Sequence, residues 1–249
     1  MTQNTTITLV TGGNRGIGRE TARQLAGLGQ TVLLGTRDAG RGAAAAEELR
    51  AAGGDVHAIE LDVTDPAGVA AAAKRVDEEY GRLDVLINNA VNFGGSWADA
   101  ERYTPSTADL DVIRAVFETN VFGVLTVTNA FLPLMLRSPA PRIVNVSSGV
   151  GSLAVMSDPA GPYAGMPPAV TYPPSKTALN AMTVQYAKQF RDSALLINAA
   201  DPGYTATNGN DDPNARPVAE GAAIVVRLAT LPADGPSGGF FDDAGPVPW

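Results

Sequence analysis

A tyrosine and a lysine stand four positions apart in the segment TYPPSKTALN, residues 171–180. Residues at this spacing share one face of a helix, so Tyr172 and Lys176 can converge on one group. A phenol, with a pKa of about 10, is a weak acid near neutrality. An ammonium at about 4 Å, in an effective dielectric constant of about 20, favours the phenolate by about 4 kcal/mol before the cost of burial. The pair is a candidate proton-transfer device, and Pro173 and Pro174 suit the first turn of its helix.

A glycine-rich segment, LVTGGNRGIGRE (9–20), has the spacing T-G-x-x-x-G-x-G. Glycine allows a tight turn and a close approach of the backbone to a pyrophosphate, and the N-terminus of the helix that follows supplies unpaired N–H groups. The sequence therefore predicts a dinucleotide site between a first strand and a first helix. The contacts expected in this turn are Gly12, Asn14, Arg15, Gly16, Ile17 and Gly18.

The end of the second expected strand, LLGTRD, bears on the choice of dinucleotide. With Thr36 as the last strand residue, Arg37 follows directly, and Arg15 can reach in from the glycine turn. Two guanidinium groups suit the 2′-phosphate of NADP because arginine binds phosphate with two N–H groups. The alternative places Asp38 on the ribose hydroxyl of NAD and leaves Arg37 on the surface. We favour NADPH/NADP⁺.

Short, nearly continuous apolar runs alternate with longer Ala-rich segments of helical period along the whole chain. Such runs are typical of parallel strands that are covered on both faces. The pattern predicts an α/β fold, a doubly wound parallel sheet of about seven strands with helices on both faces, in one Rossmann-like domain spanning 1–249. Strands are expected at 6–11, 31–36, 56–62, 83–88, 142–147, 195–200 and 238–243, and helices near 16–28, 39–52, 66–80, 108–136, 173–191 and 217–230. In the first helix, Ile17, Thr21, Leu25 and Leu28 are expected to face the sheet.

Three long segments, 91–107, 149–171 and 202–216, are rich in Gly, Pro, Asn and Asp. Each follows an expected strand and should project from the carboxyl edge of the sheet, where ligands bind in open α/β folds. Loops of this length in a compact domain are usually functional or disordered. We expect 149–171 and 202–216 to form substrate-site loops. Tyr163 has no lysine four residues later and is at best a substrate-loop residue.

Composition narrows the classes of partner. A net charge of −8 argues against nucleic acid and against an anionic membrane surface. The absence of cysteine removes disulfides, zinc–thiolate sites and cysteine nucleophiles, and we expect no metal. The N-terminal segment lacks a basic region, and no apolar run approaches the length of a membrane span. We therefore expect a cytoplasmic protein that acts on a small molecule.

The motifs TGGNRGIG, LDVLINNA, ETNVFG, IVNVSS, YPPSK and DPGYTAT occur in the order and approximate spacing of single-domain short-chain dehydrogenase/reductases. Essentially the whole chain resembles this family, and most of all its carbonyl-reductase branch. The resemblance implies that Tyr172 protonates a carbonyl oxygen as hydride arrives, and that Lys176 holds the nicotinamide ribose and lowers the pKa of the tyrosine. Ser148 would orient the carbonyl, and Asn120 would anchor a water that passes protons to Lys176. Ser147 would replace Ser148 if the strand slipped by one residue.

Further cofactor contacts are expected at positions where the sequence evidence is weaker. Asp62, at the end of the third strand, would bind the adenine; the alternative is an acid at a helix start, a role that Asp65 fills better. Pro202 and Gly203 would turn the chain over the nicotinamide. The remaining expected contacts are Val63, Asn89 and Ala90 near the adenosine half, and Thr205 and Thr207 near the carboxamide or pyrophosphate.

The expected activity is NADPH-dependent reduction of a ketone or aldehyde to an alcohol, on bulky and weakly polar carbonyl compounds. One alternative is an NADP(H)-binding sensor or scaffold without turnover. Another is alcohol oxidation or a redox-neutral isomerisation on the same site. The stretch MSDPAGPYAGMPP (156–168) lengthens the gap between Ser148 and Tyr172 and should form a wall over the substrate pocket. Related reductases with inserts here can lose the usual subunit interface, so monomer, dimer and tetramer stay open.

Overall fold

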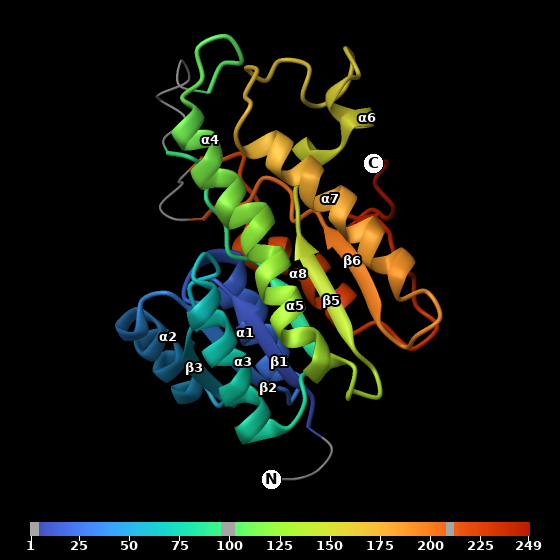
Figure 1. The fold of residues 1–249 in the computed structure, drawn as a ribbon. Helices are drawn as coiled ribbons and strands as arrows, with labels where there is room; N and C mark the ends of the chain where they lie inside the picture. The colour runs from blue at the N-terminus through green and yellow to red at the C-terminus, as the bar shows by residue number, and fades with distance from the viewer. Residues whose placement is uncertain (1–4, 96–102, 208–211) are drawn as a thin grey trace.

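A computed structural model of the chain describes residues 5–95, 103–207 and 212–249. Its centre is a seven-stranded sheet in the order β3-β2-β1-β4-β5-β6-β7, and every pair of neighbouring strands is parallel. The expected doubly wound fold is confirmed (Figure 1). The strands are β1 (Ile7–Thr11), β2 (Thr31–Thr36), β3 (Val56–Glu60), β4 (Val85–Asn88), β5 (Arg142–Val146), β6 (Leu196–Ala200) and β7 (Phe240–Phe241).

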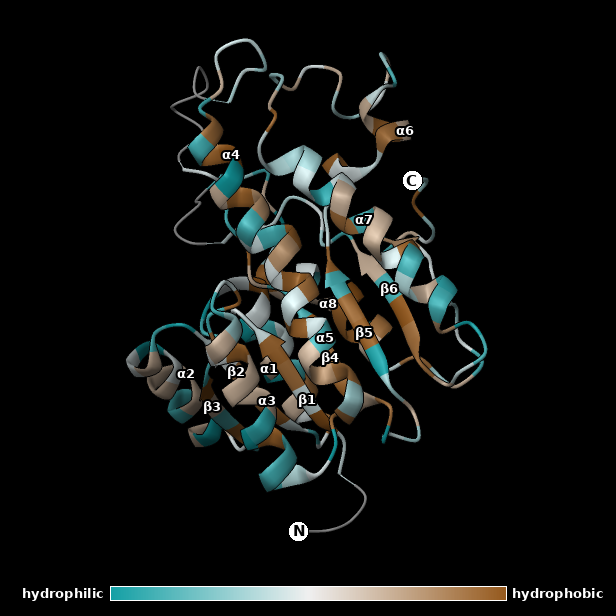
Figure 2. Ribbon diagram, viewed as in Figure 1, coloured by the Kyte–Doolittle hydropathy of each residue, from teal (hydrophilic) through white to brown (hydrophobic). Residues whose placement is uncertain are grey.

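Helices cover both faces of the sheet. One layer holds α3 (Pro66–Tyr80), α5 (Gly123–Met135) and α7 (Tyr172–Gln189), and the other holds α1 (Gly16–Gly27), α2 (Ala39–Ala51) and α8 (Val218–Ala229). Successive strand residues point to opposite layers: Leu9 lies in the first core and Val10 in the second. Figure 2 shows the hydrophobic residues along the strands. Burial on both faces is why the strands are continuous apolar runs in the sequence.

Two expected boundaries differ from the structure. Leu28 was expected to face the sheet, but α1 ends at Gly27 and the side chain of Leu28 is 63% exposed. The expected strand 238–243 is reduced to Phe240–Phe241. Gly238 has a φ of 80°, which is outside the strand region, and the Asp242 carboxylate accepts the N–H groups of Ala244 and Gly245 to form a turn.

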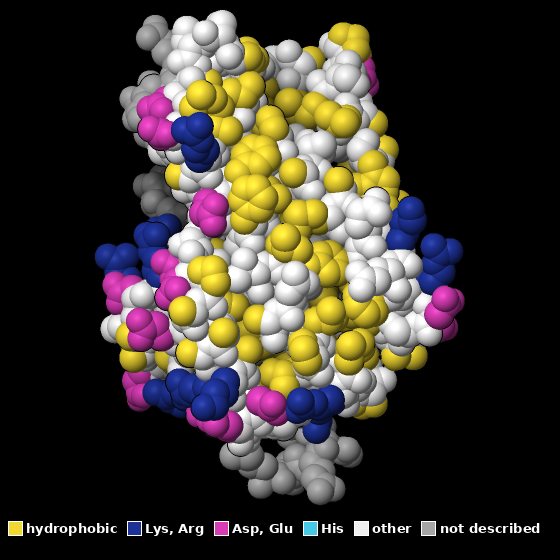
Figure 3. All heavy atoms as spheres, in the orientation of Figure 1, with side chains coloured by type: hydrophobic (Ala, Val, Ile, Leu, Met, Phe, Trp, Pro, Cys, Tyr) yellow, Lys and Arg dark blue, Asp and Glu magenta, His cyan; other side chains and the backbone are white. Residues whose placement is uncertain are grey.

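The long helix expected over 108–136 contains a π-helical turn. It consists of α4 (Leu110–Phe117), the π turn η2 (Glu118–Phe122) and α5, and α3 packs against α5. The segment 149–171, expected as a loop, also holds a 3₁₀ turn, η3 (Gly149–Gly151), and a short helix, α6 (Leu153–Met156). Figure 3 shows hydrophobic side chains on this face of the molecule, and residues 110–136 include large apolar residues that are exposed. They are Leu110, Phe122, Leu125 and Leu136.

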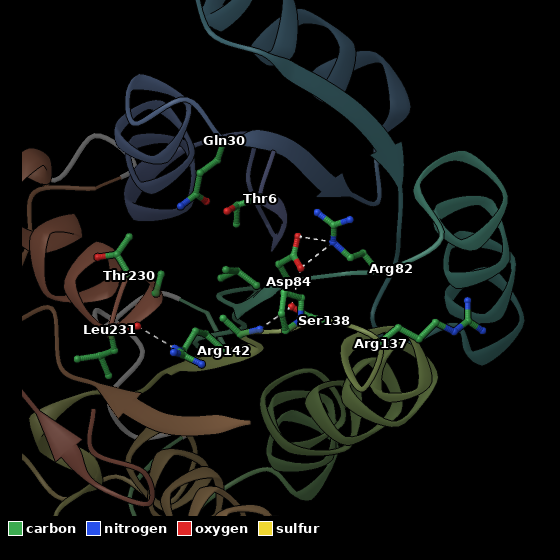
Figure 4. Close-up of a pocket in the computed structure, with 13 residues that line it drawn as sticks. Thr6, Gln30, Arg82, Asp84, Arg137, Ser138, Arg142, Thr230 and Leu231 are labelled. Atoms are coloured by element: carbon green, nitrogen blue, oxygen red, sulfur yellow. Dashed lines mark hydrogen bonds and ion pairs between the residues drawn. The ribbon is translucent and has the colours of Figure 1, made fainter. Parts of the chain in front are cut away.

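A hollow of about 450 Å³ lies at the amino edge of the sheet, away from the segments that follow the strands (Figure 4). Its polar groups bind one another. The buried Asp84 carboxylate accepts the N–H of Ile7 at 2.8 Å, the hydroxyl of Ser138 at 2.5 Å and the guanidinium of Arg82 at 2.9 Å. Arg142 donates to the carbonyl oxygens of three residues, namely Leu231, Pro141 and Ala194. These hydrogen bonds close the amino end of the sheet, so the hollow has a structural role.

Replacing Asp84 with alanine should lower the free energy of unfolding by about 3–5 kcal/mol, because Arg82 and the Ile7 N–H lose a buried acceptor. Asp111→Ala is the matched control. Its carboxylate also pairs with an arginine, Arg114, at 2.8 Å, but the side chain is 87% exposed, and such pairs contribute about 1 kcal/mol or less. Urea denaturation of both variants checks this. Equal losses for the two would contradict the prediction.

Candidate active site

Tyr172 and Lys176 lie together at the start of α7. Tyr172 is the first residue of the helix, and Pro173 and Pro174 occupy its first turn. The Lys176 ammonium nitrogen lies 5.5 Å from the centroid of the tyrosine ring and donates to the carbonyl oxygen of Val146 at 2.7 Å. The side chain of Ser148 lies close enough to the Tyr172 hydroxyl to influence its pKa. The fold therefore brings three of the four predicted catalytic residues to one place at the carboxyl end of β5.

The two serines after β5 have different partners. Ser147 is buried, and its hydroxyl donates to the side-chain oxygen of Asn180 at 2.6 Å. Ser148, one residue further from the strand, is the serine that reaches Tyr172. Because β5 ends at Val146, the strand has not slipped, and the alternative that placed Ser147 in the site does not fit this geometry.

Burial dominates the electrostatics of the pair. It raises the pKa of the Tyr172 phenol, and the nearby Ser148 side chain only partly opposes this rise. Burial also lowers the pKa of Lys176 to about 7. We expected the lysine to lower the tyrosine pKa, but this pKa is raised, because desolvation disfavours the charged phenolate. Near neutral pH the tyrosine is consequently protonated, as a proton donor must be.

Asn120 lies in the π turn η2 and is buried. Its amide nitrogen donates to the carbonyl oxygen of Asn92 at 2.9 Å and to the Ser175 hydroxyl at 3.0 Å. The Ser175 hydroxyl in turn donates to the carbonyl oxygen of Tyr172 at 2.7 Å. Asn120 thus supports the first turn of α7, and its proposed water relay to Lys176 stays a prediction. Isolated π turns are often found at functional sites, and the helical period of the sequence did not reveal this one.

The glycine turn has the backbone that the sequence predicts. Gly12 and Gly16 have φ values of 64° and 55°, where residues with a side chain are strained. A Cβ on Gly18 would stand 2.7 Å from the carbonyl oxygen of Gly12, so only glycine fits there. The Asn89 side chain donates to the carbonyl oxygens of Thr11 and Gly12, at 2.9 and 3.2 Å. The loop after β4 therefore fixes the shape of the glycine turn.

Thr11 is a residue that sequence reasoning missed. Its hydroxyl accepts the N–H groups of Asn89 and Ala90, at 2.9 and 3.0 Å, and donates to the carbonyl oxygen of Ile87. The backbone N–H groups of Asn89 and Ala90, two residues expected near the adenosine half of the cofactor, thus bind Thr11. The available signal was its position directly before the first glycine.

A hollow of about 600 Å³ lies beside the glycine turn, between α1 and α2. Arg15 and Arg41 are among the residues that line it, and Arg37 stands exposed at the end of β2. The Asp38 carboxylate caps α2 by accepting the Arg41 N–H at 2.9 Å, which argues against its binding a ribose. Sequence reasoning missed Arg41, although it follows Arg37 by one helical turn.

The segment after β6 reaches the glycine turn. A Cβ on Gly16 would lie 3.4 Å from the Thr207 methyl carbon, so these residues are neighbours in space. Gly203 has a φ of 69°, which lets the chain turn after Pro202. The Thr205 hydroxyl donates within its own loop, to the carbonyl oxygens of Pro202 and Gly203. Thr207 therefore lies nearer to the expected pyrophosphate position than Thr205 does.

The residues after β3 have local partners. The Asp62 carboxylate accepts both the N–H and the hydroxyl of Thr64, at 2.9 and 2.7 Å, and remains partly exposed. Val63 is buried, and its side chain fills the space beside Gly123. Phe93, in the loop after β4, contacts the Tyr172 ring with centroids 4.9 Å apart. This contact was missed because no local pattern indicates which ring an aromatic residue in a loop will meet.

Together these features fit a dinucleotide. The glycine turn leaves room for a pyrophosphate at the N-terminus of α1, and the hollow with Arg15 and Arg41 lies where the 2′-phosphate of NADP would be bound.

Comparison with known proteins agrees with this geometry. The model of the short chain dehydrogenase family matches residues 6–217. The chain belongs to this family. It is 32% identical to (+)-neomenthol dehydrogenase of Capsicum annuum, with 96% of each sequence aligned. As a short-chain dehydrogenase, the protein is an oxidoreductase.

Solved structures of the family superpose closely. Salutaridine reductase from Papaver somniferum matches with a TM-score of 0.79 and 30% identity, over 96% of this chain and 99% of that one. The NADPH-bound carbonyl reductase from chicken fatty liver matches with a TM-score of 0.83 and 28% identity, over 98% and 99%. Within the part of the chain that the structure describes, no helix is both long and apolar enough to span a membrane.

Proposed function

We propose that this short-chain dehydrogenase reduces a ketone or aldehyde to an alcohol with NADPH, and that Tyr172 is the proton donor. The observation that carries the proposal is the approach of the Ser148 side chain to Tyr172, beside the buried Lys176 at the carboxyl end of β5. The named relatives act as reductases or dehydrogenases, and one solved relative holds NADPH. NADP is thus the cofactor, and the arrangement of Ser148, Tyr172 and Lys176 supports the proposed carbonyl reduction.

The residues divide the work between orientation and proton transfer. The Ser148 and Tyr172 hydroxyls both donate to the carbonyl oxygen, which polarises the bond and fixes its position. Bound NADPH supplies the hydride to the carbonyl carbon. The Tyr172 proton passes to the oxygen, so the product is an alcohol and the phenolate must be reprotonated. Lys176, held by the Val146 carbonyl, supplies positive charge beside the phenolate as it forms.

The protonation state favours the direction of reduction. Burial raises the Tyr172 pKa, so the phenol keeps its proton at neutral pH. Alcohol oxidation would need the phenolate as a base, and the same burial makes that form costly. The sensor and isomerase alternatives have no comparable observation in their favour.

The segments 149–171 and 202–216 form the substrate loops in this proposal, within one domain spanning 1–249; residues 208–211 of the second segment lie outside the described part of the chain. Both follow strands that end at the Ser148–Tyr172 pair. The names of the relatives, neomenthol dehydrogenase and salutaridine reductase, suggest ring-bearing, bulky substrates for this chain as well.

The direct test follows NADPH absorbance over a panel of cyclic ketones, aldehydes and quinones, with NADH in parallel. We expect turnover with NADPH and a preference over NADH of at least about tenfold, because arginine contacts to a phosphate contribute about 1.5–3 kcal/mol. Tight NADPH binding without turnover of any carbonyl would instead support the sensor. A preference for NADH would show that the arginine assignment is wrong.

A further inference from the structure

A carboxylate lies buried beside the proposed catalytic residues. Asp201 follows β6 directly, is only 8% exposed, and accepts the Gly203 N–H at 3.0 Å through one oxygen. It also accepts the Gly149 N–H, from the residue that follows Ser148. Asp201 therefore connects the loop that carries Ser148 to the loop that turns over the expected nicotinamide position. Two N–H groups leave unused acceptor capacity on a carboxylate, which can accept about four hydrogen bonds.

A second polar group, the Tyr163 hydroxyl, lies close to Asp201. Tyr163 lies in the substrate loop between α6 and α7, and its hydroxyl packs against Gly149. A Cβ on Gly149 would collide with this hydroxyl and would stand 2.7 Å from an Asp201 carboxylate oxygen. Gly149 is thus the point at which Tyr163 and Asp201 converge. A residue with a side chain at this position would separate them.

The Tyr163 hydroxyl has no hydrogen-bond partner among residues 5–95, 103–207 and 212–249. Its side chain is half-buried, so the hydroxyl can bind water or a ligand. Tyr163 and Asp201 both act electrostatically on Tyr172 and raise its pKa. Because both groups lie against Gly149, which directly follows Ser148, the pair is next to the residue that would orient the carbonyl.

We propose that Tyr163 and Asp201 form a second polar binding point for the substrate, which takes a hydroxyl group close to the reacting carbonyl. A hydroxyl group suits both partners because it donates to the Asp201 carboxylate and accepts from the Tyr163 phenol. The preferred substrates are then hydroxyketones. This inference rests on the proposed carbonyl reduction and names the substrate class for it.

The experiment compares cyclohexanone with 2- and 3-hydroxycyclohexanone as substrates of the full-length enzyme with NADPH. The wild type should prefer at least one hydroxyketone by about tenfold or more in kcat/KM, because a site that hydrogen-bonds a hydroxyl discriminates against the analogue that lacks it. Tyr163→Phe and Asp201→Asn should bring the ratio close to one. Tyr186→Phe should keep it, because the Tyr186 hydroxyl binds Asn129 on α5 instead.

A parallel measurement does not need turnover. Calorimetry compares cyclohexane-1,2-diol with cyclohexanol on the NADP⁺-loaded wild type and on Tyr163→Phe. Tighter diol binding that Tyr163→Phe abolishes supports the inference, even if no ketone in the panel is reduced and the proposed activity fails. Equal kcat/KM values and equal affinities in the wild type overturn it. A preference that survives in both Tyr163→Phe and Asp201→Asn overturns it as well.

Discussion

Tyr172→Phe is expected to lower kcat for ketone reduction about a thousandfold, since a positioned general acid contributes about 10²–10⁴-fold. The substitution removes one oxygen atom and keeps the ring, which contacts Phe93 at a centroid distance of 4.9 Å. Ser148 then orients the carbonyl without Tyr172, and the proposed proton donor is missing. Stopped-flow and steady-state absorbance of NADPH measure the loss.

The affinity for NADPH distinguishes lost chemistry from a damaged site. It should stay within about threefold of the wild-type value, because the glycine turn and the arginine hollow lie outside the altered contact. Tyr186→Phe, on the same helix, loses a hydroxyl that binds Asn129 at 2.7 Å and should retain full kcat. If Tyr172→Phe kept more than a tenth of wild-type kcat, a different group would have to be the proton donor.

The fold could be predicted because its signals are local. Strands covered on both faces are continuous apolar runs, and β2 spans the residues expected for it, 31–36. The start of α3 was equally clear: Asp65 caps the helix by accepting the Ala67 N–H, and Pro66 follows in the first turn. Leu28 shows the limit, because helical period alone did not indicate that α1 would end one residue earlier.

The candidate site could be predicted only in part, because several of its contacts join distant segments. The motifs identified Tyr172 and Lys176, which are neighbours in sequence, and the order of motifs identified Ser148. The convergence of Tyr163 and Asp201 on Gly149 depends on where two loops from different strands meet. Burial was also invisible in the sequence, so the direction of the Tyr172 pKa shift was expected to be the opposite of the one found.

Lys176→Met is expected to abolish most of the activity and at the same time to stabilise the free protein. The ammonium is buried, and its pKa falls from 10.5 to about 7 on folding. Each unit of such a shift corresponds to about 1.4 kcal/mol, so the lysine opposes folding. Methionine has a similar length and no charge, although it loses the bond to the Val146 carbonyl. We expect the free energy of unfolding to rise by about 1–3 kcal/mol.

The lowered pKa of Lys176 also predicts how the stability advantage of Lys176→Met changes with pH. Below about pH 7 the lysine is charged in both the folded and the unfolded chain, so the whole cost of burial is present. Between about pH 7 and 10.5 the unfolded chain binds the extra proton, and the stability of the wild type from this group rises with pH. The advantage of Lys176→Met should therefore be largest at pH 6 and smaller at pH 9. Urea denaturation at these two pH values, without NADPH, measures it.

Lys188→Met is the matched control, because this lysine is exposed in the last turn of the same helix. It should change neither the stability nor its pH dependence. An advantage of Lys176→Met that grew from pH 6 to pH 9 would contradict the burial argument. A loss of kcat/KM of about 100-fold or more in the same variant would show that a residue which destabilises the fold is retained for its charge beside Tyr172. The stability of the fold would then favour an uncharged side chain at position 176, whereas activity would require the charged lysine.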